Sequence, residues 1–220
     1  MVRCDGCAMT GDGVAVADAV RRRTPWQPRT AAWRPQVAVA PGRPTPTVRR
    51  LLNERGSLTA RLERLGAVHV HVLREAWQRP GADEGVALGL AVGRHAWLRE
   101  VVLDCEGGPT IYARSVVPGR MLGPLARLPR LGERPLGRLL FSAADVQRGP
   151  LAVARLRGDE PLAGRLRGHG LPNPKGGWAR RSTLSVAGRR LLVTEVFFPE
   201  GVEGEQRGAQ RRAIGPGAGP

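Results

Sequence analysis

The chain has 220 residues, enough for one domain with a moderate apolar core and further segments outside that domain. It carries 35 lysine and arginine residues against 19 acidic ones, a formal net charge of +16, and Lys175 is the only lysine. A bias towards arginine, glycine, alanine and proline is typical of GC-rich coding sequences, so the charge does not indicate nucleic-acid binding, and we expect no nucleic-acid partner.

The cysteines and the apolar stretches indicate the compartment. Three cysteines cannot form a disulfide framework, and they favour a reducing cytoplasm. Cys4 and Cys7 have the spacing of a zinc knuckle, but no second pair follows to complete a tetrahedral site. No apolar stretch approaches the roughly 20 residues that span a bilayer, and aspartates interrupt any secretory leader. We therefore expect a cytoplasmic protein without stable membrane insertion. We also expect a monomer.

Three segments have the composition of loops or tails. Residues 1–47 combine prolines and arginines without a sustained hydrophobic period, which predicts a dispensable, disordered extension and suggests a start site placed too far upstream. Similar stretches predict a low-complexity loop insertion at 149–177 and a flexible tail at 200–220. The predicted domain is therefore 48–199. It stays positively charged without these segments, which suits an anionic substrate but does not distinguish a dicarboxylate from a phosphate backbone.

The first elements of this domain are short. Residues 48–55 are predicted to form a helix that Gly56 ends, and Ser57 is predicted to cap a second helix through 65. Residues 68–72 alternate valine with His69 and His71, which is the periodicity of a strand. A His-x-His pair can bind a metal, but on a half-buried strand both imidazoles more often face solvent.

Two hairpins are predicted to follow. The first joins 97–104 to 110–117 through a turn rich in glycine, and the second joins 179–186 to 190–198. Between the hairpins, 136–141 is a predicted helical turn after a proline. This order predicts the α+β class, with a single antiparallel β-sheet and a few helices.

Two charged residues are predicted to face the core. Arg99 shares a strand face with Val101 and Leu103, and Glu195 lies in an apolar strand on the same face as Val193. A buried ion costs several kcal/mol unless it is paired, so each of these charges requires a partner. From the spacing alone, Arg99 and Glu195 pair with each other or hold a ligand.

Five segments, in order along the chain, resemble those of the chorismate pyruvate-lyase (chorismate lyase) family. They cover about 48–148 and 178–199, and as a set they are more specific than any one of them. The segments are SLT at 57–59, WLREVVL at 97–103 with ARSVVP at 113–118, LG at 131–132 with RPLGRLLF at 134–141, WARRS at 178–182, and LLVTEVFFP at 191–199.

The resemblance implies a lyase that converts chorismate into 4-hydroxybenzoate and pyruvate, as in the first committed step of ubiquinone biosynthesis. It implies an α+β fold that encloses a small internal ligand pocket without a metal or organic cofactor. Arg99 would bind the ring carboxylate and Glu195 the ring hydroxyl, and the backbone of Leu58 and of Leu136 would line the site. The chain departs from the family at both ends and in the longer linker at 149–177.

Two alternatives to this enzyme remain. The ligand-binding domains of one bacterial regulator family share the general fold, so the chain could be a non-catalytic aromatic-acid sensor. Such regulators carry a winged helix upstream, which the proline-broken first 47 residues do not supply. The third hypothesis is an aromatic-acid carrier with a degraded site.

Overall fold

One antiparallel sheet organises the computed structural model, which describes residues 30–35, 44–106, 110–119, 124–141, 146–186 and 188–198. The order of the strands across the sheet is β1-β6-β7-β8-β4-β3-β2, and the short β5 pairs with β7 beside this path. The strands are β1 (Arg34–Pro35), β2 (Val68–Gln78), β3 (Ala96–Cys105), β4 (Ile111–Pro118), β5 (Gln147–Arg148), β6 (Ala152–Arg155), β7 (Trp178–Val186) and β8 (Arg189–Phe197).

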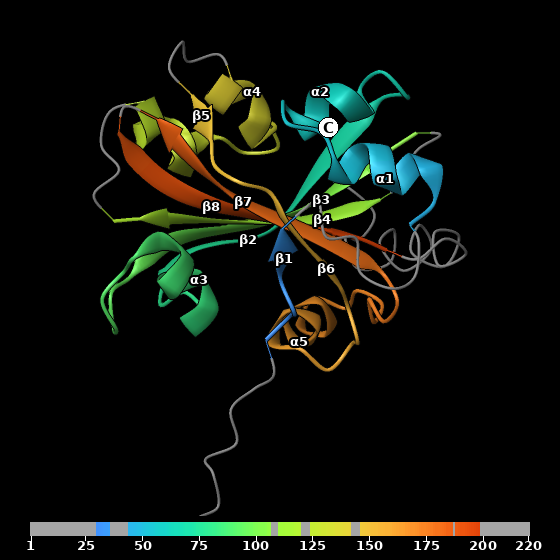
Figure 1. Ribbon diagram of the computed structural model, residues 1–220. Helices are drawn as coiled ribbons and strands as arrows, with labels where there is room; N and C mark the ends of the chain where they lie inside the picture. The colour runs from blue at the N-terminus through green and yellow to red at the C-terminus, as the bar shows by residue number, and fades with distance from the viewer. Residues whose placement is uncertain are drawn as a thin grey trace, which may run out of the picture.

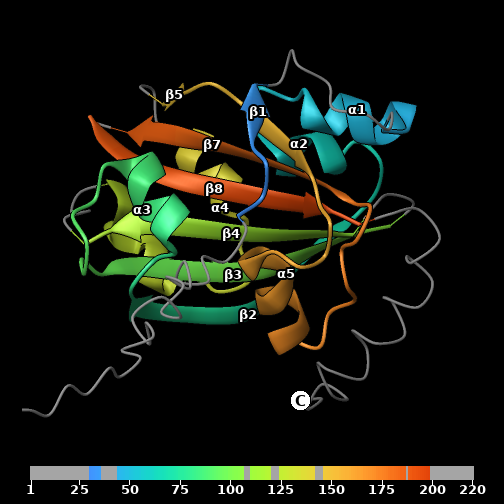
Figure 2. The same cartoon turned by 60° about the horizontal axis from the view of Figure 1, so that its bottom comes forward.

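Helices cover both faces of this sheet (Figure 1). One face carries α1 (Pro46–Leu52), α2 (Leu58–Leu62), the 3-10 helix η1 (Pro124–Arg130) and α4 (Leu136–Phe141). The opposite face carries α3 (Ala82–Leu88) and α5 (Pro161–Gly168), which lie in front of the sheet in Figure 2. Because alternate residues of a strand point to opposite faces, neighbours such as Val101 and Val102 belong to different cores.

The structure confirms the α+β class and most of the predicted elements. Both hairpins form, with β3 paired to β4 and β7 paired to β8. The hydroxyl of Ser57 accepts a hydrogen bond from the N–H of Ala60 at 3.2 Å, as expected of the residue that caps α2. Thr45 caps α1 in the same way, since its hydroxyl accepts from the N–H of Val48.

The segment at 149–177, expected to be a loop insertion, contains β6 and α5. Pro161 opens α5, where a missing N–H is not needed, and the side chains of Ala163 and Leu166 are fully buried one helical turn apart. The many glycines and arginines around these two residues hide the short apolar face in the sequence. The helix α3 was also missed.

Part of the predicted N-terminal extension packs on the domain. Strand β1 pairs with β6, Ala31 is buried, and the guanidinium of Arg181 stacks 4.4 Å from the centre of the Trp33 ring. Residues 1–29, 36–43 and 200–220 lie outside the described residues, and so do Cys4 and Cys7.

The contacts of residues 30–35 predict the effect of shortening the N-terminus. A chain that begins at Val48 is expected to melt at a lower temperature than one that begins at Thr30, because it lacks β1, the buried Ala31 and the stacked Trp33. Circular dichroism at 222 nm measures both melting temperatures. Equal values would show that residues 30–47 are dispensable for stability, as their composition suggests.

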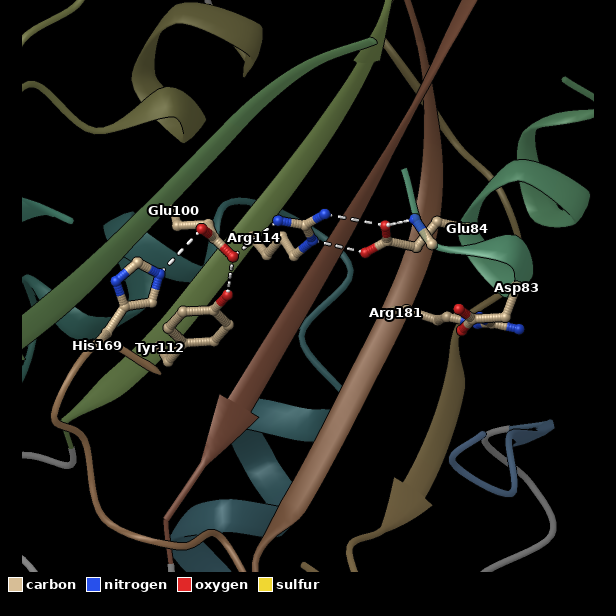
Figure 3. A network of polar contacts seen from close by, with 8 residues as sticks. Asp83, Glu84, Glu100, Tyr112, Arg114, His169 and Arg181 are labelled. Carbon is tan, nitrogen blue, oxygen red and sulfur yellow. Dashed lines mark hydrogen bonds and ion pairs between the residues drawn. The ribbon is translucent and has the colours of Figure 1, made fainter. Parts of the chain in front are cut away.

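A buried polar network lies on the face that carries α3 and α5 (Figure 3). Arg114 donates to Glu84 at 2.7 and 3.1 Å and to Glu100 at 2.7 Å. Glu100 also accepts from the hydroxyl of Tyr112 at 2.6 Å and lies 2.9 Å from the ring of His169. The network therefore links α3, the strands β3 and β4, and the end of α5.

No helix among the described residues combines the length and the apolar character that a bilayer span requires.

Candidate functional site

A small pocket lies between the sheet and the helices α2 and α4, where the centre of a water-sized sphere can occupy about 50 Å³. The four residues singled out in the sequence, Leu58, Arg99, Leu136 and Glu195, all line it. Most of the remaining wall is apolar and includes Val70, Val101, Leu103, Leu140, Leu184 and Val193. The sheet thus forms a largely apolar floor beneath a few charged groups.

The starts of two helices form the roof of this pocket. Leu58 is the first residue of α2, and Leu136 is the first residue of α4. The first N–H groups of a helix have no partner within the helix, so they can donate to a ligand. Gly137 lets the two helices approach, because a Cβ atom there would lie 2.7 Å from the hydroxyl oxygen of Ser57.

Arg99 enters the pocket from β3 and is 3% exposed. Its guanidinium is ion-paired to Glu75, and it donates to the carbonyl of Gly132 at 2.7 Å and to that of Arg134 at 3.2 Å. These contacts engage three of the five N–H donors with described residues, so two remain for a ligand. The guanidinium is therefore held in place from one side.

An irregularity in β2 sets the partner of Arg99. The pairing of β2 with β3 shifts between Val72 and Arg74, and as a result Glu75 lies opposite Arg99. Without this extra residue, Arg74 would take that position. Two like charges directly opposite each other destabilise a sheet, whereas an opposite charge stabilises it.

Glu195 enters the pocket from β8, beside Arg180 of β7. The two residues are cross-strand neighbours and form an ion pair. Arg180 is fully buried, and it also donates to the carbonyls of Leu51 and Glu54 at 2.6 and 2.7 Å, which fastens the end of α1 to the site. The Glu195 carboxylate is thereby held at the pocket wall.

These contacts rule out one of the two interpretations of the buried charges. The hypothesis that Arg99 and Glu195 pair with each other is wrong, because each has its own cross-strand partner. Glu75 and Arg180 were missed because the register of β2 and β7 is not visible in the sequence. Arg180 does lie within the WARRS segment, two residues after the apolar Trp178 on the same strand face.

Arg148 of β5 is a further pocket residue that the sequence did not suggest. It lies in a stretch without periodicity, before Gly149 and Pro150. Its guanidinium donates to the carbonyls of Arg55 and Gly56 and to the hydroxyl of Ser182. Burial lowers the pKa of Arg148 from its ordinary value, and the nearby Glu195 partly offsets this effect.

The two histidines of β2 lie away from this pocket's wall. The His69 side chain is 61% exposed, with its ring 3.9 Å from the carboxylate of Glu106, and His71 is half-buried. Within the described ranges, no three His, Cys, Asp or Glu side chains gather where they could hold a metal ion. The structure thus offers no support for a metal at His69 and His71.

Comparison with known proteins gives the family. The model of the chorismate lyase family matches residues 27–202. The chain belongs to the chorismate lyase family. A probable chorismate pyruvate-lyase of Halorhodospira halophila (strain DSM 244 / SL1) is 84% identical over 187 residues, which cover 85% of this chain and all of that protein. Another, from Aromatoleum aromaticum (strain DSM 19018 / LMG 30748 / EbN1), is 39% identical over 179 residues, covering 79% of this chain and 95% of that protein.

Among solved structures, the effector domain of PhnF from Mycobacterium smegmatis matches this chorismate lyase family member with a TM-score of 0.46 and 14% identity. The match covers 66% of this chain and 90% of that one. This likeness is too distant to bear on function.

Proposed function

We propose that the pocket beneath α2 and α4 is the active site of a chorismate pyruvate-lyase, which converts chorismate into 4-hydroxybenzoate and pyruvate. The observation that supports this site most is the meeting of Arg99, Glu195, Leu58 and Leu136 in one pocket, although they are far apart in the sequence. Membership of the chorismate lyase family supplies the reaction.

The shape of the substrate matches the charges of the pocket. Chorismate carries a carboxylate on ring carbon C1, an enolpyruvyl ether on C3 and a hydroxyl on C4. Arg99 binds the ring carboxylate, because its fixed guanidinium keeps N–H donors on Nε and Nη1 that its contacts with Glu75, Gly132 and Arg134 do not use. Glu195 binds the hydroxyl at the opposite end of the ring. The N–H groups of Leu58 and Leu136 line the space beside these contacts.

The reaction requires little acid–base chemistry from the protein. The bond between C3 and the ether oxygen breaks while the hydrogen of C4 moves to the methylene carbon of the enolpyruvyl group. The ether oxygen becomes the keto oxygen of pyruvate, and the ring becomes aromatic, so no atom is gained or lost. Aromatisation drives the reaction, and the protein has mainly to hold one conformer and stabilise separating charge. An apolar pocket with a few fixed charges suits that task.

The experiment that tests this function is direct. The purified protein is incubated with chorismate in buffer with a metal chelator, and 4-hydroxybenzoate and pyruvate are measured against a reaction without protein. We expect the two products in equal amounts and at the same rate as without chelator. No product above the control would refute the enzyme and leave a sensor or a carrier. If the chelator lowers the rate and one added metal restores it, a metal at His69 and His71 would have to be considered again.

The product is expected to leave slowly, because it keeps the carboxylate and the hydroxyl that Arg99 and Glu195 hold. Added 4-hydroxybenzoate should therefore inhibit competitively, with an inhibition constant below the KM for chorismate. Initial rates at several product concentrations measure this constant. Inhibition only at concentrations far above KM would contradict these two contacts.

Other parts of the proposal rest on the resemblance and the composition. These are a cytoplasmic, monomeric protein whose 4-hydroxybenzoate enters ubiquinone biosynthesis.

A further inference from the structure

Arg148 lines the pocket but has no part in the contacts proposed above. Resting on the proposed function, we propose that Arg148 binds the second carboxylate of chorismate, the one on the enolpyruvyl group. Three features of the structure carry this assignment: the charges that surround the guanidinium, its position across the sheet, and the contacts that hold it in place.

The first feature is the balance of charge in the pocket. Arg99 is paired with Glu75, and Glu195 is paired with Arg180, so these two pairs are each neutral. Among the described residues, the Arg148 guanidinium contacts only neutral groups. These are the carbonyls of Arg55 at 2.8 Å and Gly56 at 3.1 Å, the hydroxyl of Ser182 at 2.5 Å, and the ring of Phe141, whose centre is 5.5 Å away.

Within the described residues, no carboxylate forms an ion pair with Arg148. Its nearest acidic neighbours, Glu195 and Glu54, act on it only through space. Arg148 is half-buried and an arginine stays charged in a protein, so its charge has lost part of its hydration without gaining a counter-ion. The pocket therefore has one uncompensated positive charge, and a substrate anion would compensate it.

The second feature is where Arg148 lies relative to the other two groups. Arg99 is on β3, Glu195 is on β8 two strands away, and β7 and then β5 follow on the far side of β8. Arg148 of β5 is the cross-strand neighbour of Leu184, another pocket residue. Crossing the pocket from Arg99, one thus meets Glu195 first and Arg148 beyond it.

The positions of the substituents of chorismate fit this arrangement. Its enolpyruvyl ether is on C3. This carbon is next to the one that carries the C4 hydroxyl, and it is meta to the C1 carboxylate. With the C1 carboxylate at Arg99 and the hydroxyl at Glu195, the enolpyruvyl group lies at the Glu195 end. Arg148 is the lining cation on that side.

The third feature is that Arg148 is held from two sides, because it donates to loop backbone and its guanidinium also lies 5.5 Å from the centre of the Phe141 ring at the end of α4. Its bonds to Arg55 and Gly56 fix the turn between α1 and α2, directly before Ser57 caps α2. A guanidinium so fixed is presented to a ligand without loss of side-chain freedom on binding. It also stays in place when pyruvate leaves.

The assignment separates substrate from product. 4-Hydroxybenzoate lacks the enolpyruvyl carboxylate, so Arg148 should contribute to the binding of chorismate and not to that of the product. Arg99 and Glu195, in contrast, should contribute to both. A purely structural Arg148 would affect both ligands alike.

The test compares Arg148→Gln, Arg148→Lys and a control, Arg138→Gln, with the intact protein. Arg138 is an exposed arginine of α4 whose partner is Glu63, so its replacement removes the same charge near the pocket but outside it. Each protein is assayed for kcat and KM with chorismate and for the Kd of 4-hydroxybenzoate by calorimetry.

For Arg148→Gln we expect kcat/KM to fall by about tenfold to a hundredfold and the product Kd to change by less than about threefold. Arg148→Lys keeps the charge and should recover part of the loss, and Arg138→Gln should match the intact protein. An unchanged kcat/KM, or a product Kd weakened as much as kcat/KM, would overturn the assignment.

Two further outcomes stay interpretable. If Arg148→Gln does not fold, Arg148→Lys decides the question, since a rise in KM with an unchanged product Kd supports the contact and an equal loss of both refutes it. If the intact protein does not convert chorismate, the proposed function fails, whereas a failure of the Arg148 assignment leaves the intact protein fully active.

Discussion

Replacing Arg114 with methionine is expected to lower the free energy of unfolding by about 3–5 kcal/mol, because it leaves two buried carboxylates without their cation. Arg114 is 2% exposed and holds Glu84 on one side and Glu100 on the other (Figure 3). Methionine fills a similar volume without charge. The loss therefore measures the network rather than the packing of the side chain.

The same network gives a pH dependence whose sign follows from the two carboxylates. Burial alone would raise the pKa of Glu84, but its hydrogen bonds and ion pair with Arg114 outweigh burial and lower it. Burial likewise opposes the hydrogen bond from Tyr112 and the charge of Arg114, which together lower the pKa of Glu100. A carboxyl group with a lowered pKa in the folded state stabilises the fold above its ordinary pKa. That stability is lost as the pH falls through the lowered value.

Denaturant unfolding at pH 7 and at pH 4 to 3 tests both statements. The intact protein should lose stability over that acid range, and Arg114→Met should lose less, because its carboxyl groups are no longer held ionised. Arg94→Met is the matched control, since Arg94 is exposed. A decrease at pH 7 below about 1 kcal/mol for Arg114→Met would show that the network contributes little.

The second large effect is expected for Arg99→Lys. Lysine keeps the charge but not the planar group of fixed N–H donors, so kcat/KM should fall by about tenfold to a hundredfold, or about 1.4 to 3 kcal/mol. Glu195→Gln should weaken the binding of 4-hydroxybenzoate through the hydroxyl contact, with a smaller effect on rate, because the hydrogen moves within the substrate. The melting temperature, the product Kd and kcat/KM are measured together for each variant.

A control from the opposite strand separates binding from structure. Glu75→Gln breaks the ion pair of Arg99 but leaves the guanidinium in the pocket. If Arg99 only stabilises the sheet, Glu75→Gln and Arg99→Lys should behave alike, and both should keep their activity per folded molecule. Near-normal kinetics and product binding in folded samples of Arg99→Lys and Glu195→Gln would refute these two assignments, even if chorismate is converted.

The elements that the sequence predicted are those whose pattern is local. The two hairpins have alternating apolar residues and a turn, and α2 has Ser57 as its cap, so each can be recognised without knowledge of its neighbours. The strand β2 was predicted only as 68–72, because the charged Arg74 and Glu75 continue a strand without the apolar alternation.

The site was predicted in part for the same reason. The inward direction of Arg99 and Glu195 follows from the period of two in their own strands, and the structure confirms it by placing both at one pocket. Their partners depend on which strand lies beside which and in what register, and that is a property of the whole sheet. Arg148 lies in a strand of two residues, too short to show any period.

Side chains of β3 and β4 point alternately to the two faces of the sheet, and this limits which insertions and deletions the chain can tolerate. Arg99 and Glu100 are neighbours in β3, yet the first belongs to the pocket and the second to the network on the opposite face. The same holds for Ala113 and Arg114 in β4. A single-residue insertion or deletion within β3 would exchange the two faces of that strand, placing Glu100 in the pocket and Arg99 beside Arg114 on the opposite face. A substitution of Arg99 is expected to affect the pocket, and one of Glu100 the network. A shift of register by one residue is expected to disrupt both at once.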